Sequence, residues 1–160
     1  MDLITPCLWF DGDAEDAAAF YTGLFPDSRI VEVGHYTEST PGETGSVMIV
    51  VFELGGRRFT ALNGGPQFPF TEAISLQIDC ASQEEIDRYW DALIAEGGEP
   101  SVCGWCKDRF GLSWQVVPRR FNEIMSEADG DTAERVMAAV MKMRKIDLAE
   151  IERAAAPAAA

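Results

Sequence analysis

Two cysteines three positions apart are the residues of this chain best suited to chemistry. The run 103–106 reads Cys-Gly-Trp-Cys, the Cys-x-x-Cys spacing of redox dithiols and of half a zinc site. A redox dithiol places its first cysteine at a helix N-terminus, whereas this run leads into a turn and a strand. A zinc site would need two further ligands, and Cys7, Cys80 and His35 lie at unrelated spacings. We therefore expect structural thiols and keep a redox protein as an alternative.

The chain has one histidine, His35, and histidine is the commonest general base near neutral pH. It lies at the end of an expected strand, before a segment at 37–42 made of Thr, Glu, Ser, Pro and Gly. This context indicates a residue at the surface or at a pocket rim. The sequence therefore leaves the catalytic residues, if the protein is an enzyme, unassigned.

The strands and helices that position these residues occur in the same order in both halves of the chain. The first half predicts a strand at 3–10, a helix with its apolar stripe on Ala17, Phe20, Tyr21, Leu24 and Phe25, and strands at 29–36, 46–54 and 57–63. The second half predicts a strand at 70–79, a helix opened by a capping box at Ser82 and Glu85, and strands at 100–103, 105–107 and 112–118. Each half is a βαβββ module, so the fold class is α+β.

The domain organisation follows from this repeat. The modules span about 3–63 and 70–118, and a helical extension follows at 119–153. We expect one domain at 1–153 and a disordered tail at 154–160, because that tail has no apolar bulk to bury. The length of 160 residues also favours one domain.

Side chains alternate across a strand, so each expected strand has two faces. One face of the first, fifth and eighth strands is apolar and suits packing under helices; the other mixes hydroxyl, amide and aromatic groups, as ligand pockets do. A face covered only by solvent or by a second copy is the alternative. The residues that we predict to line a pocket are Thr5, Cys7, Trp9, Ala61, Asn63, Ser75, Gln77, Trp105, Ser113 and Gln115.

Two consecutive βαβββ modules resemble the vicinal oxygen chelate superfamily, which includes glyoxalase I, the bleomycin and fosfomycin resistance proteins and the extradiol dioxygenases. The helix text Phe-Tyr at 20–21 with Leu-Phe at 24–25 and the Asp-Arg-Phe-Gly turn at 108–111 are similar to that superfamily's motifs. The runs at 9–12, 25–28, 61–66 and 104–108 look like its PhnB-like branch, often labelled 3-demethylubiquinone-9 3-methyltransferase. The resemblance covers about 3–152 and implies paired modules that form a curved mixed sheet.

The resemblance also implies where a divalent metal would bind. Carried over by position, its ligands fall on Thr5, on Phe59 or Ala61, on Ala73 and on Gln115. Because only Gln115 is of a suitable type, we expect no metal and no other cofactor. A glyoxalase-like or dioxygenase-like metalloenzyme acting on a small oxygenated substrate remains the alternative.

The methyltransferase label finds no support in the residues, although it is kept as a further alternative. The glycines at 64–65 lead toward another strand, whereas an S-adenosylmethionine loop joins a strand to a helix.

The charge limits the partners. The chain carries 27 acidic and 13 basic residues, a formal net charge of −14, which disfavours nucleic acid and anionic membranes. With no signal segment and no apolar run of about 18 residues, we expect a cytoplasmic protein. Six of the 13 basic residues lie between Arg119 and Lys145, which predicts docking of a basic, Met-rich helix on the acidic body or on a second copy. The preferred hypothesis is a metal-free, homodimeric, small-molecule-binding protein, with catalysis left open.

Overall fold

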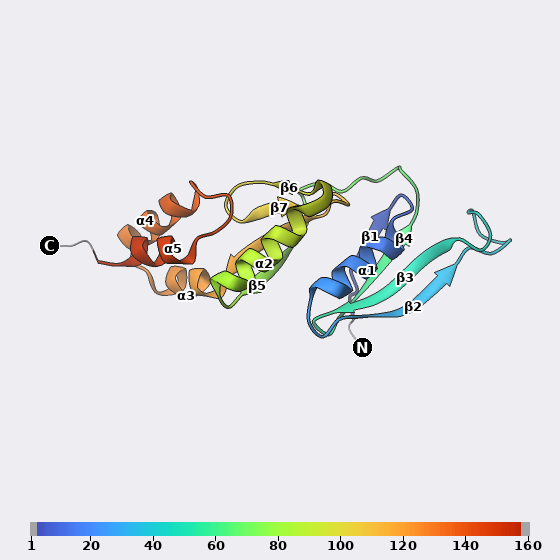
Figure 1. The fold of residues 1–160 in the computed structure, drawn as a ribbon, viewed down its shortest axis with the longest axis horizontal. Helices are drawn as coiled ribbons and strands as arrows, with labels where there is room; N and C mark the ends of the chain where they lie inside the picture. Colours follow the sequence, from blue (N-terminus) through green and yellow to red (C-terminus); the bar gives the residue numbers. More distant parts are fainter. Residues whose placement is uncertain (1–2, 158–160) are drawn as a thin grey trace. The chain divides into compact units, whose positions relative to one another are not determined.

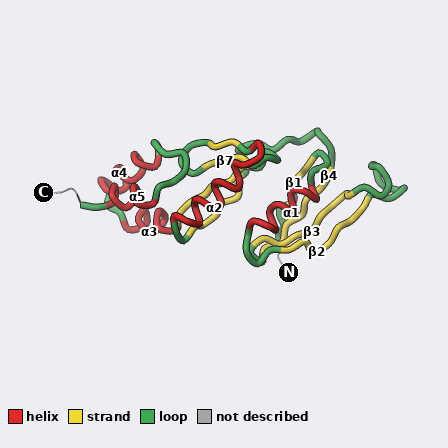
Figure 2. Tube along the Cα trace, viewed as in Figure 1, coloured by secondary structure: helices red, strands yellow, loops and turns green. Residues whose placement is uncertain are grey.

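The computed structural model describes residues 3–157. These residues divide into two compact units that join in the sequence between Phe70 and Thr71. Each unit contains one βαβββ module, and the second unit also carries the helical extension (Figures 1 and 2). The predicted α+β class with two βαβββ modules is confirmed. That the modules and the extension make a single domain stays a prediction.

The first unit is a four-stranded mixed sheet with the strand order β1-β4-β3-β2 and one helix on it. Its elements are β1 (Cys7–Phe10), α1 (Ala14–Leu24), β2 (Arg29–His35), β3 (Val47–Leu54) and β4 (Arg57–Asn63). β1 and β4 are parallel, and the other pairs are antiparallel. Buried alanines at 14, 17 and 18 leave room for Tyr21 to pack on Phe52, which stacks on Phe59 at 5.5 Å between ring centroids.

Two strands begin several residues later than the sequence predicts, and the sixth strand covers Glu99–Pro100 rather than 100–103. The first begins at Cys7 rather than at residue 3, because Pro6 has no amide hydrogen and contributes only its carbonyl, which accepts from Thr60 N at 3.0 Å. The fifth, β5 (Ser75–Cys80), begins five residues later than predicted, where its pairing with β8 starts. Both predicted strands were too long because they included apolar residues that precede the paired segments.

The second unit has the strand order β5-β8-β7-β6, with β5 and β8 parallel. Its further elements are α2 (Gln83–Ile94), η1 (Ala95–Gly97), β6 (Glu99–Pro100), β7 (Trp105–Lys107) and β8 (Ser113–Pro118). The predicted capping box is present: Ser82 Oγ accepts from Glu85 N at 3.3 Å, and Glu85 Oε2 accepts from Ala81 N at 2.7 Å. The buried side of α2, which contacts β7 and β8, carries Ile86, Tyr89, Trp90 and Leu93.

The extension folds into three helices, α3 (Arg119–Glu127), α4 (Gly130–Val140) and α5 (Leu148–Ala155). Asp129 caps α4 and Asp147 caps α5, each through a carboxylate that accepts a hydrogen bond from a backbone amide in the first turn. Because α5 runs to Ala155, the first two residues of the predicted disordered tail are helical. Residues 158–160 of that tail lie outside the described part of the chain.

No helix within residues 3–157 combines the length and the apolar composition needed to cross a bilayer.

Candidate functional site

The sheet of the second unit has one face that is not covered by α2, and strand pairing fixes which residues lie on it. One row across the four strands runs Ser75, Ser113, Lys107, Glu99, because each is paired with the next. The neighbouring row runs Gln77, Gln115, Trp105. Paired residues in a sheet have side chains on the same face, with Cβ atoms about 5 Å apart. We call this surface the open face of the second sheet.

A pocket of about 430 Å³ lies at the β6–β7 end of the open face. Its lining residues are Glu72, Glu99, Pro100, Ser101, Val102, Trp105, Cys106, Lys107 and Ser113. The volume suits a small molecule, and the lining combines an indole, two carboxylates, an ammonium and hydroxyls.

Ser113 lies in this pocket with its hydrogen-bonding capacity unused. The residue is 1% exposed, and its Oγ has no hydrogen-bond partner within the described part of the chain. A buried hydroxyl without a partner costs about 1 to 3 kcal/mol. Such a cost in a native fold calls for a compensating role, and a ligand that bonds to the hydroxyl would supply one.

Lys107 is the cross-strand neighbour of Ser113 and brings a positive charge. Its Nζ lies 2.5 Å from Glu72 Oε1, and this hydrogen bond raises the pKa of Lys107 and lowers that of Glu72. Glu99, paired with Lys107 across β6 and β7, raises the lysine pKa further. An ammonium has three donor hydrogens, so one carboxylate partner leaves donors for a ligand.

Within the described residues, Ser113 has no base that would activate it as a nucleophile. A serine nucleophile needs a base within hydrogen-bond reach, and Ser113 has no partner. The single histidine, His35, lies exposed at the end of β2 in the first unit. Donors at Lys107 and Ser113 suit the oxygen acceptors of a ligand, while Glu72 and Glu99 suit its donors.

Of the pocket residues predicted in this unit, Trp105 and Ser113 line the pocket. Ser75, Gln77 and Gln115 share the open face but lie outside the pocket lining, and Gln115 Nε2 donates to Ser75 Oγ at 2.9 Å. Sequence reasoning missed Lys107, Glu72 and Glu99. Lys107 could have been found, because it lies two positions after Trp105 on the same strand and therefore on the same face.

In the first unit the predicted residues separate onto two faces. Cys7 and Trp9 lie on the face away from α1, and Thr5 precedes that strand. Trp9 is held in place, since its Nε1 donates to Gly65 O at 2.7 Å and its ring meets Phe68 edge-on at 5.0 Å. These contacts make Trp9 a support for the loop after β4.

Ala61 and Asn63 lie on the face of β4 that pairs with Leu8 and Phe10 of β1. Ala61 pairs with Leu8 and is fully buried under α1, so it lines no open face. Asn63 pairs with Phe10 and is tied into the fold: its Oδ1 accepts from Ala14 N and its Nδ2 donates to Val47 O, each at 2.9 Å. Its amide thus replaces the missing side-chain cap of α1. A separate pocket of about 450 Å³ does include Asn63, at the loop ends of this unit.

The donor set does not fit the metal site that the superfamily implies. Phe59 and Ala61 belong to the buried face of β4, so the open-face position there is Thr60. With Thr5, Ala73 and Gln115 at the other positions, the amide of Gln115 is the one suitable group. Across residues 3–157 no three His, Cys, Asp or Glu side chains converge as metal ligands. We derive no step through a metal.

The glycines at 64–65 do not fit S-adenosylmethionine either. The amides of Gly64 and Gly65 both donate to Phe10 O, at 3.0 and 3.2 Å, and no helix follows them before β5. A phosphate-type or nucleoside-binding loop would need those amides free at a helix N-terminus.

The four cysteines are free thiols. Burial raises the pKa of Cys106 to about 12, and Asp108 adds to the shift. Cys103 lies nearer the surface, with its Sγ 3.5 Å from Met141 Sδ. A thiol that stays protonated at neutral pH is a poor partner for disulfide exchange, so the geometry disfavours a redox pair.

The fold and its paired modules define the class of protein, a member of the vicinal oxygen chelate superfamily. The model of the family described as 3-demethylubiquinone-9 3-methyltransferase matches residues 2–117. The PhnB protein from Bacillus cereus is 36% identical, with a TM-score of 0.67 over 73% of this chain and 99% of that chain. This chain belongs to that family and is PhnB-like.

More distant structures share the fold. Protein PA1353 from Pseudomonas aeruginosa is 22% identical, with a TM-score of 0.61 over 74% of this chain and 98% of that one. The fosfomycin resistance protein FosX from Listeria monocytogenes is 17% identical, with a TM-score of 0.56 over 79% of this chain and 98% of that one. No curated protein matches this chain.

Proposed function

We propose that this protein binds a small oxygenated molecule in the pocket on the open face of the second sheet. The observation that carries the proposal is the buried, unpartnered hydroxyl of Ser113, a residue whose cross-strand neighbour is Lys107. Membership of the PhnB-like family supports a small-molecule role.

The pocket chemistry narrows the ligand class. Two adjacent donors favour a carboxylate, phosphonate or carbonyl oxygen at Ser113 and Lys107. The half-buried indole of Trp105 favours a flat or apolar part next to that oxygen. The acidic side chains of Glu72 and Glu99 disfavour ligands that are more highly charged than one phosphonate group.

We propose further that binding needs no metal. A structure of a FosX mutant from Listeria monocytogenes is described as a complex with Mn(II) and 1S,2S-dihydroxypropylphosphonic acid, so a metalloenzyme is the second candidate for a chain of this fold. The four positions, Thr5, Thr60 in place of Phe59 or Ala61, Ala73 and Gln115, argue against it here, because three of the four have no side-chain group that holds a divalent ion tightly.

Phenylphosphonate is a suitable probe, because it joins an oxyanion to a ring. We expect titration, followed by the NMR resonance of the Trp105 indole N–H, to show saturable binding to the wild type. Lys107→Met should weaken binding by on the order of 10-fold through loss of one charged hydrogen bond. Ser126→Ala, on α3 and outside the pocket, serves as the control. Equal affinity of the wild type and Lys107→Met would overturn the proposed site.

The metal question has its own measurement. Protein purified without chelator should contain well under one equivalent of divalent metal by mass spectrometry, and phenylphosphonate affinity should not change on adding Mn²⁺. One tightly held equivalent per chain would establish the metalloenzyme instead.

The proposal includes the homodimer that the family resemblance implies. Sedimentation velocity at several concentrations should give twice the chain mass of 17.6 kDa. A monomer at all concentrations would remove this part and leave the pocket, which lies within one unit, unaffected.

A further inference from the structure

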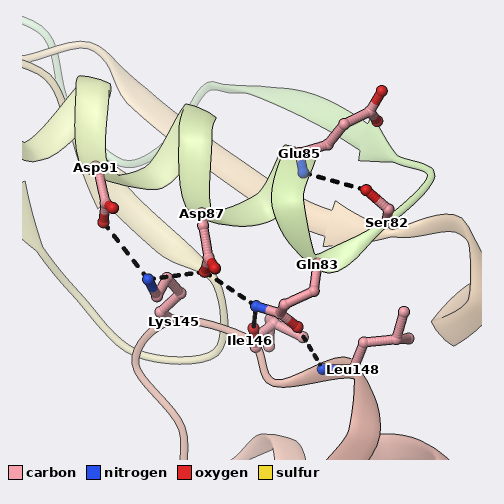
Figure 3. Close-up of polar contacts among 8 residues, drawn as sticks. All are labelled: Ser82, Gln83, Glu85, Asp87, Asp91, Lys145, Ile146 and Leu148. Atoms are coloured by element: carbon pink, nitrogen blue, oxygen red, sulfur yellow. Dashed lines mark hydrogen bonds and ion pairs between the residues drawn. The ribbon is translucent and has the colours of Figure 1, made fainter.

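The segment between α4 and α5 is attached to α2 by hydrogen bonds from a neutral amide and by ion pairs between a lysine and two aspartates. Figure 3 shows Gln83 pointing at this segment, where its Nε2 donates to Ile146 O at 3.1 Å and its Oε1 accepts from Leu148 N at 2.8 Å. Beside it, Lys145 Nζ lies 2.8 Å from Asp87 and 3.5 Å from Asp91. We call residues 143–148 with Gln83 the clamp. Docking of a basic, Met-rich helix stays a prediction; within the second unit, Lys145 in the loop after α4 pairs with two acidic residues of α2.

The clamp also holds the turn that precedes β7. Cys103 N donates to Met143 O and Gly104 N donates to Arg144 O, each at 2.8 Å. Ile146 is buried against Gly104, where an added Cβ would lie 3.0 Å from Ile146 Cγ1 and 2.8 Å from Val116 O. Gly104 has a φ of +81°, so both the conformation and the close approach require glycine.

This turn is a wall of the proposed pocket. Ser101, Val102 and Trp105 line the pocket, and they flank the two residues that the clamp holds. The turn is internally tied as well, since Trp105 N donates to Val102 O at 3.0 Å and Ser101 N donates to Trp105 O at 2.9 Å. A displacement of residues 103–104 would therefore move Trp105.

We infer that the C-terminal extension is part of the ligand site: through the clamp it sets the turn at 101–105, and Gln83 and Lys145 are positioning residues for Trp105. The inference rests on the proposed function. The extension goes beyond the family match, which ends at residue 117, so this wall is fixed by structure that the match does not cover. Neither Gln83 nor Lys145 lines the pocket on the open face.

Gln83→Ala tests the inference, because it removes all three side-chain hydrogen bonds of Gln83, two to the clamp segment and one to Asp87 within α2, and leaves the pocket residues intact. Amide hydrogen exchange at Cys103 and Gly104 should become on the order of 10-fold faster, while amides in the β5–β8 pair keep their rates. The Trp105 indole resonance should shift, and phenylphosphonate affinity should fall by about 3-fold or more. Unchanged exchange at Cys103 and Gly104 would overturn the inference.

Lys145 provides the second test with a matched control. Lys145→Met should produce the same changes in weaker form. Lys145→Arg should keep the exchange rates and the probe affinity of the wild type. Lys142→Met should have no effect, because Lys142 is exposed and three residues away from Lys145. Faster exchange with unaltered probe affinity would also overturn the inference. If the wild type fails to bind the probe, the proposed function fails. The exchange rates and the Trp105 resonance then show by themselves whether the clamp positions the turn at 101–105.

Discussion

The indole Nε1 of Trp114 donates a 2.7 Å hydrogen bond to Asp108 Oδ2 inside the second unit. The same carboxylate accepts from Phe110 N at 2.9 Å and from Leu112 N at 3.1 Å, and Asp108 is 3% exposed. The carboxylate therefore fixes both the turn at 108–111 and the face of β8. Because Ser113 lies between Leu112 and Trp114, this carboxylate holds the residues on both sides of the pocket serine.

Asp108→Asn should reduce the free energy of unfolding of the second unit by about 2 kcal/mol, because the new amide hydrogens would oppose the Trp114 N–H. Urea unfolding followed by tryptophan fluorescence measures the loss. A double-mutant cycle with Trp114→Phe should give a coupling energy of at least about 1 kcal/mol. Additive effects of the two changes would show that the contact contributes nothing of its own.

Gly64→Ala should destabilise the first unit by about 1 to 3 kcal/mol through overpacking, since an added Cβ would lie 2.1 Å from Trp9 Cζ2. Trp9 has little room to move because its indole is bonded to Gly65. Gly23→Ala in α1 is the matched control: nothing lies within 4 Å of its Cβ, and it should raise stability by about 0.5 to 1 kcal/mol. Equal effects of both changes would contradict the packing account.

The buried thiols predict a pH dependence above neutrality. Burial raises the pKa of Cys80 and of Cys106 to about 12, from 9.0 for an unperturbed thiol. Between pH 9 and 12 the unfolded thiols ionise while the folded ones keep their protons, so stability falls as pH rises through this window. Cys106→Ala should make the fall of the free energy of unfolding with pH less steep than in the wild type, because one buried thiol is removed. An identical slope in the variant would count against the assignment.

At pH 8 a thiol reagent should label Cys7 first and reach Cys106 only on unfolding. Mild oxidation should leave four free thiols. A disulfide between Cys103 and Cys106 in the folded protein, read by mass spectrometry, would revive the redox alternative.

Local signals in the sequence predicted most of the fold. The capping box at Ser82 and Glu85 and the buried stripe of α2 depend on residues three or four positions apart, so a sequence contains all that determines them. The docking of the extension was predicted only in outline. A side-chain amide such as Gln83, bonded to backbone far along the chain, leaves no periodic pattern.

The candidate site was predicted less completely, for a different reason. On β4 both faces contain apolar groups, with Phe59 and Ala61 on one and Leu62 on the other, so alternation does not say which face α1 covers. The pairing of Leu8 with Ala61 decides it. Likewise Glu72 precedes its strand and Glu99 belongs to a strand of two residues, too short for any alternation to show.

Ser113→Ala tests the central claim most directly, because it separates binding from stability. The change removes a buried hydroxyl that has no partner in the described fold, so the free energy of unfolding should stay the same or rise by about 1 kcal/mol. Phenylphosphonate affinity, measured by the Trp105 indole resonance on the same preparation, should fall by about 5-fold or more. A loss of stability with unchanged affinity would contradict the account, since Ser113 would then serve the fold and not a ligand.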